Sequence, residues 1–404
     1  MTTLRSKPLI PQTLPLTGIT VVSLEHAIAA PFASRQLADL GARVIKVERP
    51  GDGDFARRYD TRVDGLASHF VWVNRSKESL TLDLKNELAM SALQRLLERT
   101  DVLLQNLAPG AAARMGLSYE QLKSKFPRLI VCDVSGYGAD GPDRDRKAYD
   151  LLIQSEAGFL SITGTPESPS KAGCSIADIA AGMYAFTSIQ SALLLRERTG
   201  QGSGIDISML ESLAEWMGYP LYYSYKDASP PERAGASHST IFPYGPFKAG
   251  DGRSVMLGLQ NDREWIAFCE KVLENSALAT DGRFKTNALR SENRTELTGL
   301  IEETFSSLSA PEVAAKLNAA DIANANMNDM HDLWNHKQLQ ARNRWVPVDT
   351  PVGPVPALKP PGRSTAYEPR MDAIPAVGAQ TDAILKELGF DSSTIERLRA
   401  AKAI

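Results

Sequence analysis

The sequence has few residues that commonly bind metals or form disulfides, with three cysteines and five histidines among 404 residues. Cys132, Cys174 and Cys269 are odd in number and far apart, which disfavours a disulfide scaffold and a zinc site. His331 and His336 are five positions apart, on opposite sides of any helix that they share. We therefore expect no metal, and a reducing, cytoplasmic location.

The sequence also lacks a strong charge of either sign and a long apolar run. Its formal net charge is −3 at pH 7, so no overall basic field points to nucleic acid or an anionic membrane as a partner. No apolar run approaches the length of a membrane span. Residues 1–15 have no long apolar stretch and no small-residue cleavage site, so we interpret them as an arm and not as a signal peptide.

Common catalytic motifs are missing too. Gly51 and Gly53 follow a strand-like segment, but no third glycine opens a helix at the spacing of the dinucleotide fingerprint. The glycines of residues 200–204 follow a helix-like segment and precede a strand-like one, which favours a left-handed helix cap. Residues 135–138 resemble a nucleophile elbow but lack its leading glycine. Hydrolytic and dinucleotide-fingerprint chemistry are therefore unsupported.

Between residues 18 and 210, strand-like and helix-like segments alternate. Their periodicity predicts strands at 19–24, 43–48, 101–105, 129–134 and 204–209, and helices at 31–40, 86–99, 117–126 and 179–196. This order predicts an α/β fold, a mostly parallel sheet covered by helices on both faces. Ligands of such sheets bind beyond the carboxyl ends of the strands.

The pattern changes after about residue 225. Residues 228–236 are rich in proline and small residues and are typical of a linker. A smaller domain is predicted to follow, with a strand at 254–257 and helices at 262–273 and 294–306. Residues 345–375 are proline-rich and expected to run extended over the surface, before closing helices at 382–388 and 394–401.

Asp178 lies near the start of the long apolar helix predicted at 179–196. By residue type alone, an aspartate in this place is most often an N-cap. The alternative is a reactive carboxylate.

Several segments match one enzyme family in order and spacing, among them LGARVIKVERPGDGD at 40–54 and SGYGADGP at 135–142. Further matching segments are residues 16–24, 29–31, 74–85, 106–110, 114–116, 148–150 and 174–183. Together they resemble the family III CoA-transferases, also called the CaiB/BaiF family, which include formyl-CoA:oxalate and succinyl-CoA:dicarboxylate CoA-transferases. The resemblance runs from about residue 16 to the C-terminus.

The resemblance implies a large Rossmann-like domain formed by both chain ends and a small α+β domain inserted between them. On this basis, residues 1–224 begin the large domain, 225–332 form the small domain, and 333–404 return to complete the large one. It also implies that two copies interlock as a homodimer, so folding and dimerisation would be inseparable.

The resemblance further implies a CoA-transferase in which Asp178 is the covalent nucleophile. Its carboxylate would attack an acyl-CoA to give a mixed anhydride, and the CoA thiolate would convert this into an aspartyl-CoA thioester. An acceptor acid would then reverse these steps. No tightly bound cofactor and no metal are needed, since CoA arrives with the substrate. The small-domain match favours succinyl-CoA as donor and a short dicarboxylic acid as acceptor.

Ten residues match positions that hold CoA in the family. They are Ala29, Arg49, Leu82, Lys85, Asn106, Leu107, Ala111, Arg114, Lys147 and Met209. The lysines and arginines suit phosphate groups, although surface charge is an equally ordinary reading of each one. Leu107 stands where some members have an aromatic residue.

Three residues match positions beside the nucleophile. Asp150 could tune Asp178 or cap the helix that follows it. Tyr149 stands where related α-methylacyl-CoA racemases have a histidine, and a tyrosine, with a pKa near 10, is a poor general base. His238 could contact the acyl group or acceptor, or be a structural histidine. Arg75 or Arg233 could hold the distal carboxylate of a dicarboxylic acid.

Two alternatives stay open. The chain could catalyse racemase-like proton transfer, or it could be an inactive CoA-binding protein. The retained Asp178 and the tyrosine at position 149 favour CoA transfer over both.

Overall fold

The computed structural model of the protein describes residues 13–404, so most of the predicted N-terminal arm, residues 1–12, lies outside it. The chain divides into two compact units. Unit 1 comprises the described part of Met1–Ala157 together with Gly173–Trp216 and Leu339–Ile404, and unit 2 comprises Gly158–Ala172 and Met217–Gln338. The domain boundaries predicted at residues 224 and 332 stay predictions.

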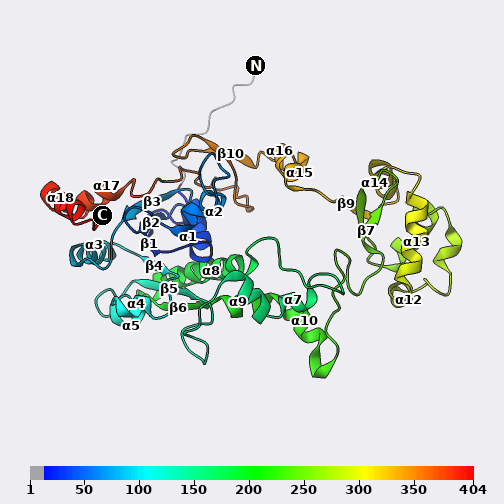
Figure 1. The fold of residues 1–404 in the computed structure, drawn as a ribbon, viewed down its shortest axis with the longest axis horizontal. Coiled ribbons are helices and arrows are strands. Elements are labelled where there is room, and N and C mark those ends of the chain that lie inside the picture. Colours follow the sequence, from blue (N-terminus) through cyan, green and yellow to red (C-terminus); the bar gives the residue numbers. More distant parts are fainter. Residues whose placement is uncertain (1–12) are drawn as a thin grey trace, which may run out of the picture. The chain divides into compact units, whose positions relative to one another are not determined.

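Unit 1 is built on a six-stranded sheet (Figure 1). Its strands are β1 (Thr20–Leu24), β2 (Arg43–Glu48), β3 (Lys77–Thr81), β4 (Val102–Gln105), β5 (Ile130–Ser135) and β6 (Gly204–Ser208). All neighbours pair in parallel, in the order β3-β2-β1-β4-β5-β6. The predicted parallel α/β sheet is confirmed. Strand order reverses between β1 and β4, where doubly wound sheets form their ligand crevice.

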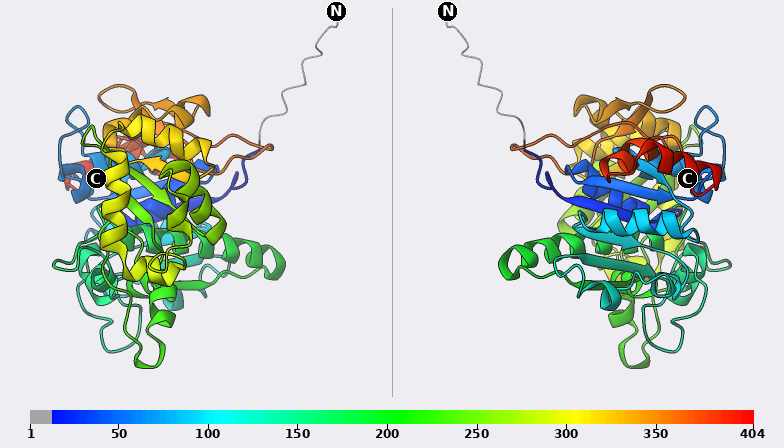
Figure 2. Two further views of the ribbon diagram at one scale, coloured as in Figure 1. Left: turned by 90° about the vertical axis from the view of Figure 1, so that its right-hand side faces the viewer. Right: turned by 90° about the vertical axis from the view of Figure 1, so that its left-hand side faces the viewer.

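Helices cover both faces of this sheet because its strands are apolar on both sides. One face carries α3 (Glu87–Leu97), α17 (Thr381–Glu387) and α18 (Ser392–Ala400), which share an apolar core with Val22 and Ile45. Figure 2 shows these three helices on one side of the strands in its right-hand view. The other face carries α1 (Ala29–Asp39) and α8 (Ile176–Thr199).

The C-terminal segment covers the edge strand β3. The Gln380 side chain accepts a hydrogen bond from the Ser79 amide at 2.8 Å, and Arg370 donates to the Ser76 carbonyl at 2.9 Å. These contacts pair backbone groups that an open edge would leave exposed to another chain. Residues far apart in the sequence thus belong to one layer of unit 1.

Shorter elements complete unit 1. They are η1 (Phe55–Arg58), α2 (Ser68–Val73), α4 (Ala111–Arg114), α5 (Tyr119–Leu122), α6 (Asp150–Glu156), α9 (Met209–Trp216), and an antiparallel hairpin of β10 (Trp345–Val348) and β11 (Val355–Leu358).

Unit 2 contains a three-stranded antiparallel sheet, β7-β8-β9, beside an apolar core that includes Phe247, Trp265 and Phe305. The strands are β7 (Tyr244–Lys248), β8 (Ser254–Gly258) and β9 (Ala323–Asn326). The helices are α7 (Phe159–Ile162), α10 (Gly218–Tyr223), η2 (Tyr225–Asp227), α11 (Asp262–Ala267), a π-turn η3 (Phe268–Val272), η4 (Ser276–Ala279), α12 (Asn287–Glu292), α13 (Arg294–Phe305), α14 (Ala310–Ala319) and α15 (Met330–Trp334). Helix α16 (Lys337–Ala341) lies at the boundary of the two units.

The predicted elements differ from the observed ones in instructive places. The helix expected at 117–126 is only α5, and residues 123–125 follow it as turns. Residues 345–375 are expected to run extended over the surface, and the structure adds that part of them pairs as the β10–β11 hairpin. The left-handed helix cap is confirmed at Gly200, which ends α8 with a φ of 73°.

Helices α1 and α8 approach closely at Gly182. A Cβ atom there would lie 2.6 Å from the Ala29 carbonyl oxygen and 3.1 Å from the Phe32 ring. Gly182 is one helical turn after Asp178, so this contact sets how the start of α8 lies against the start of α1.

We predict that Gly182→Ala destabilises the protein by about 1–3 kcal/mol, because backbone must move to make room for the methyl group. Gly299 in α13 is the matched control, since an added Cβ there meets no atom within 4 Å. Gly299→Ala should stabilise by about 0.5–1 kcal/mol through helix propensity. Urea denaturation of both variants measures the difference, and equal effects would contradict the packing argument.

Candidate active site

Asp178 lies at the carboxyl edge of the sheet in unit 1. Helix α8 connects β5 to the parallel strand β6, so its N-terminus lies at the edge where the strands end. The helix begins at Ile176 with Ser175 in the N-cap position, which makes Asp178 its third residue. The N-cap interpretation of Asp178 is therefore wrong. Within residues 13–404 its half-buried carboxylate has no hydrogen-bond or ion-pair partner.

The start of α8 is capped by Asp150 instead. One carboxylate oxygen, Oδ1, accepts from the Ala177 amide at 2.8 Å and more weakly from the Asp178 amide at 3.4 Å. The other, Oδ2, accepts from Gln154 Nε2 at 2.7 Å. Asp150 is the first residue of α6, whose own N-cap position is Tyr149. It thus caps α8, not the helix that follows it in sequence.

Burial raises the pKa of Asp178 to about 7, and the negative charge of Asp150 adds to the shift. The carboxyl is therefore poised between its acid and its ionised form at neutral pH. The sequence allowed two roles for Asp150, tuning Asp178 or capping the helix that follows it. The raised pKa of Asp178 agrees with the first.

Tyr59 is a candidate site residue that the sequence analysis missed. Burial raises the pKa of its hydroxyl, and the charges of Asp54, Asp178 and Tyr149 add to this. The hydroxyl is hence within electrostatic reach of Asp178 and stays protonated as a hydrogen-bond donor. Tyr149 itself is 70% exposed. An aromatic residue in the loop after β2 was the available signal, because such loops line the ligand edge.

Five of the ten predicted CoA positions follow strand ends. Ala29 comes after β1, Arg49 after β2, Leu82 after β3, Asn106 after β4 and Met209 after β6. Because parallel strands end at one edge, the fold gathers these positions there. The side chains of Ala29, Leu82 and Met209 are buried, so any ligand contact by them is with backbone or a small exposed edge.

The four predicted phosphate-binding cations are alike in exposure and pairing. Arg49, Lys85, Arg114 and Lys147 are all exposed, and none has an ion-pair partner among residues 13–404. Arg114 makes only long hydrogen bonds, of 3.4 and 3.5 Å, to the Pro109 carbonyl. Unpaired guanidinium and ammonium groups keep their donors available for phosphate.

Asn106 and its neighbours shape the loop after β4. The Asn106 side chain accepts from the His26 amide at 2.8 Å and donates to the His26 carbonyl at 2.9 Å. It therefore ties the loops after β1 and β4 together at the switch point, a role that the sequence did not predict. Leu107 is half-buried against the core of unit 1, and Ala111 begins α4.

His238 belongs to unit 2, and hydrogen bonds fix its ring. Its Nδ1 accepts from the amides of Thr240 and Ile241, each at 3.1 Å, and the ring stacks on Tyr244 at 5.3 Å. The neutral ring therefore carries its proton on Nε2. His238 also lines a cavity of about 210 Å³ with residues that include Glu232. A contact with the acyl group or acceptor stays a prediction.

Arg75 and Arg233 were considered as contacts for the distal carboxylate of a dicarboxylic acid. Both form hydrogen bonds within the protein. Arg75 is buried in a two-pronged ion pair with Asp39, at 2.8 and 2.7 Å, so its proposed substrate contact is wrong. Arg233 donates to the carbonyls of Thr165 and Pro166 at 2.8 and 2.9 Å. Among residues 13–404, no three His, Cys, Asp or Glu side chains gather as a metal site.

The sequence profile described as CoA-transferase family III matches residues 16–381. The chain belongs to this family. Among curated relatives, succinyl-CoA:glutarate CoA-transferase of Mus musculus is 33% identical over 96% of this chain and 90% of its own length. Acetyl-CoA:oxalate CoA-transferase of Acetobacter aceti is also 33% identical, over 92% of this chain and 95% of its own length. A crystal structure of a CAIB/BAIF family protein from Brucella suis is 34% identical, with a TM-score of 0.83 over 93% of this chain and all of that one.

Membership of family III confirms the resemblance seen in the sequence and makes the protein a CoA-transferase. Enzymes of this class use CoA thioesters as substrates. In the described part of the chain, no helix combines the length and the apolar character needed to cross a membrane.

We predict that kcat/KM rises with pH around 7, as the Asp178 carboxyl ionises, and that Asp150→Asn moves this rise to lower pH. Asparagine keeps an oxygen for the Ala177 amide but removes the charge that disfavours ionisation of Asp178. The pH dependence of kcat/KM reports the free enzyme and measures the shift. Glu156→Gln, the same charge change at the other end of α6, should leave the midpoint in place; an unmoved midpoint in Asp150→Asn would contradict the assigned cause.

Proposed function

We propose that the protein moves CoA from succinyl-CoA to a short dicarboxylic acid through covalent intermediates on Asp178. The observation that carries this proposal is the carboxylate of Asp178, which has no partner among residues 13–404 and a pKa raised to about 7. It lies at the sheet edge toward which parallel α/β folds bind ligands. The printed names of relatives pair succinyl-CoA with glutarate or L-malate, and acetyl-CoA with oxalate.

The reaction starts with attack of an Asp178 oxygen on the thioester carbonyl carbon. The C–S bond breaks, CoA leaves as its thiolate, and a mixed anhydride remains on the enzyme. The thiolate then attacks the Asp178 carbonyl carbon and expels the donor acid as a carboxylate, which leaves an aspartyl-CoA thioester. The acceptor carboxylate repeats both steps in reverse and regenerates Asp178. No net proton, oxidant or ATP is required.

Each predicted group has a place in this scheme. Arg49, Lys85, Arg114 and Lys147 would hold the phosphates of CoA, since all four are exposed and without an ion-pair partner in residues 13–404. The protonated hydroxyl of Tyr59 would donate to the oxygen that carries the developing charge.

The test is intact-protein mass spectrometry after incubation with succinyl-CoA and a rapid quench. We expect a CoA-sized mass increase that maps to Asp178, and its loss in Asp178→Asn, which keeps the size of the side chain. Acetyl-CoA is the second donor to try. Absence of any adduct together with deuterium wash-in at the α-carbon would favour the racemase alternative, and tight CoA binding without either reaction would favour the inactive binder.

We also propose that two copies form the interlocked homodimer and that the enzyme is cytoplasmic. Apolar side chains that a partner would cover are exposed on unit 1, including Leu194 and Leu195 of α8 and Leu151 and Leu152 of α6. Sedimentation equilibrium should therefore give a dimer with no measurable monomer at micromolar concentration, and loss of the dimer should coincide with unfolding. A folded monomer at these concentrations would contradict the interlocked arrangement.

A further inference from the structure

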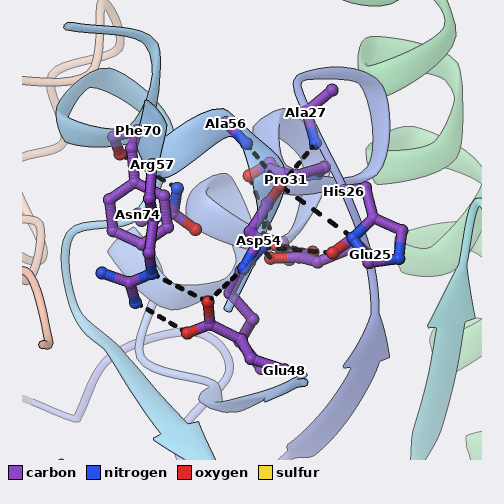
Figure 3. A network of polar contacts seen from close by, with 12 residues as sticks. Glu25, His26, Ala27, Pro31, Glu48, Asp54, Ala56, Arg57, Phe70 and Asn74 are labelled. Atoms are coloured by element: carbon purple, nitrogen blue, oxygen red, sulfur yellow. Dashed lines mark hydrogen bonds and ion pairs between the residues drawn. The ribbon is translucent and has the colours of Figure 1, made fainter. Parts of the chain in front are cut away.

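The glycine-rich motif at residues 51–54 matches no dinucleotide fingerprint. Its last residue, Asp54, belongs to a buried ionic cluster beneath the loop between β1 and α1 (Figure 3). The cluster contains three acids and three bases, so its formal charges cancel: Glu25, Lys46, Glu48, Asp54, Arg57 and Lys77. Unpaired charges are costly to bury, so these groups depend on one another for their positions.

Asp54 connects this cluster to the backbone of two loops. Its Oδ2 accepts from Lys46 Nζ at 2.8 Å, inside the cluster. Its Oδ1 accepts from the Ala56 amide at 2.9 Å and from the Ala27 amide at 3.3 Å. One fully buried side chain therefore links the loop after β1 to the loop after β2.

The motif needs glycine at position 53 because of the backbone conformation and the close packing there. The φ of Gly53 is +67°, and a Cβ atom would lie 2.6 Å from Glu48 Oε2. That same oxygen accepts from the Asp54 amide at 2.9 Å. A side chain at position 53 would push Glu48 away and release the backbone of Asp54.

Ala27 is the residue on which Asp54 acts. Its φ of +58° lies in the left-handed region, which disfavours every residue except glycine. On its other side, Asn106 holds both the amide and the carbonyl of His26. The turn is thus clamped by Asp54 from one loop and by Asn106 from another.

The clamped turn leads directly into α1, whose first residue touches the helix of the nucleophile. The Ala29 carbonyl lies against Gly182, one helical turn from Asp178. Displacement of Ala27 would shift Ala29 and with it the contact between α1 and α8. Misplacement of reacting groups by about 1 Å lowers rates by about 100-fold.

We propose that Asp54 is a positioning residue of the transfer reaction, because its bond to the Ala27 amide holds the loop between β1 and α1 in place beside Asp178. This inference rests on the proposed function. Asp54 touches neither the substrate nor the reacting atoms in this role, and it acts through the turn alone.

The test compares steady-state kinetics of Asp54→Ala and Asp54→Asn in the full chain, with succinyl-CoA and glutarate. Asparagine keeps an oxygen that accepts from Ala27 and Ala56, whereas alanine removes it. We expect kcat per active site to fall by about 100-fold in Asp54→Ala and by less than about 10-fold in Asp54→Asn, with KM for succinyl-CoA nearly unchanged in both. Active sites are counted by the CoA adduct on Asp178.

Asp251→Ala is the matched control. This unit 2 carboxylate also accepts from two backbone amides, those of Arg253 at 3.1 Å and Ala310 at 3.0 Å, but none of its partners lies in unit 1. Its loss should leave kcat within about twofold, because Asp251 is exposed and the backbone amides that it binds belong to unit 2.

Glycine rescue separates positioning from a general loss of stability. Glycine adopts a left-handed φ without strain, so Ala27→Gly added to Asp54→Ala should recover kcat by about fivefold over Asp54→Ala alone. If Asp54→Ala does not fold, Asp54→Glu replaces it, because it keeps the charge beside Lys46 but displaces the oxygens. A loss of at least about tenfold in kcat is then expected.

The outcomes distinguish this inference from the proposed function. A wild-type chain that forms no CoA adduct with any donor overturns both. If the wild type reacts, and Asp54→Ala or the substitute Asp54→Glu keeps kcat within threefold of the wild-type value, only the positioning role is overturned. Absence of rescue by Ala27→Gly, with Asp54→Ala folded and slow, also overturns it, since the turn would then not be the route of action.

Discussion

The hydrogen bonds from the start of α8 to the Asp150 carboxylate are the contact on which the site depends. A helix N-terminus leaves backbone amides without partners, and Ser175 does not supply one through its side chain. Asp150 supplies it from another helix, so α6 and α8 are fixed to each other next to Asp178. The same negative charge, with burial, keeps the pKa of Asp178 high. One side chain therefore caps α8 and, after burial, contributes to the raised pKa of Asp178.

Buried charge plays a second part in unit 1, beneath the loop between β1 and α1. Burial alone would raise the pKa of Glu25, but the charges of Lys77 and Lys46 outweigh it and lower the pKa to about 2. Both lysines sit in strands of the sheet, where apolar residues would also pack. Replacing such clusters by apolar residues often costs no stability, so a cluster of this kind is better explained by the geometry that it imposes. In unit 1, the bond from the Ala27 amide to Asp54 joins this cluster to the left-handed turn at Ala27.

The sequence predicted the parallel sheet and the place of Asp178 because both depend on local patterns, namely apolar strand-length runs and a long helix after β5. It missed β3, whose polar side chains in Lys77–Thr81 lack an apolar run, since their partners lie far away in the sequence. The same reason hid the role of Asn106, which holds a residue 80 positions earlier. An aspartate can be a helix N-cap or a reactive carboxylate, so the sequence alone left both interpretations open for Asp178. The observed start of α8 at Ile176 excludes the N-cap.

The raised pKa of Asp178 matters for the proposed reaction, in which its carboxylate attacks one carbonyl carbon and is later released. In each tetrahedral intermediate the less basic group leaves more readily, so an ordinary aspartate, with a pKa of about 3.9, would be expelled far faster than a thiolate with a pKa of about 8.5. A pKa of about 7 brings Asp178 much closer to the thiolate. In the proposed reaction, attack by Asp178 on a thioester would then more often end in loss of CoA, and the aspartyl thioester would still form from the anhydride. Burial and the charge of Asp150 thereby suit Asp178 to the proposed cycle, in which its carboxylate acts both as nucleophile and as leaving group.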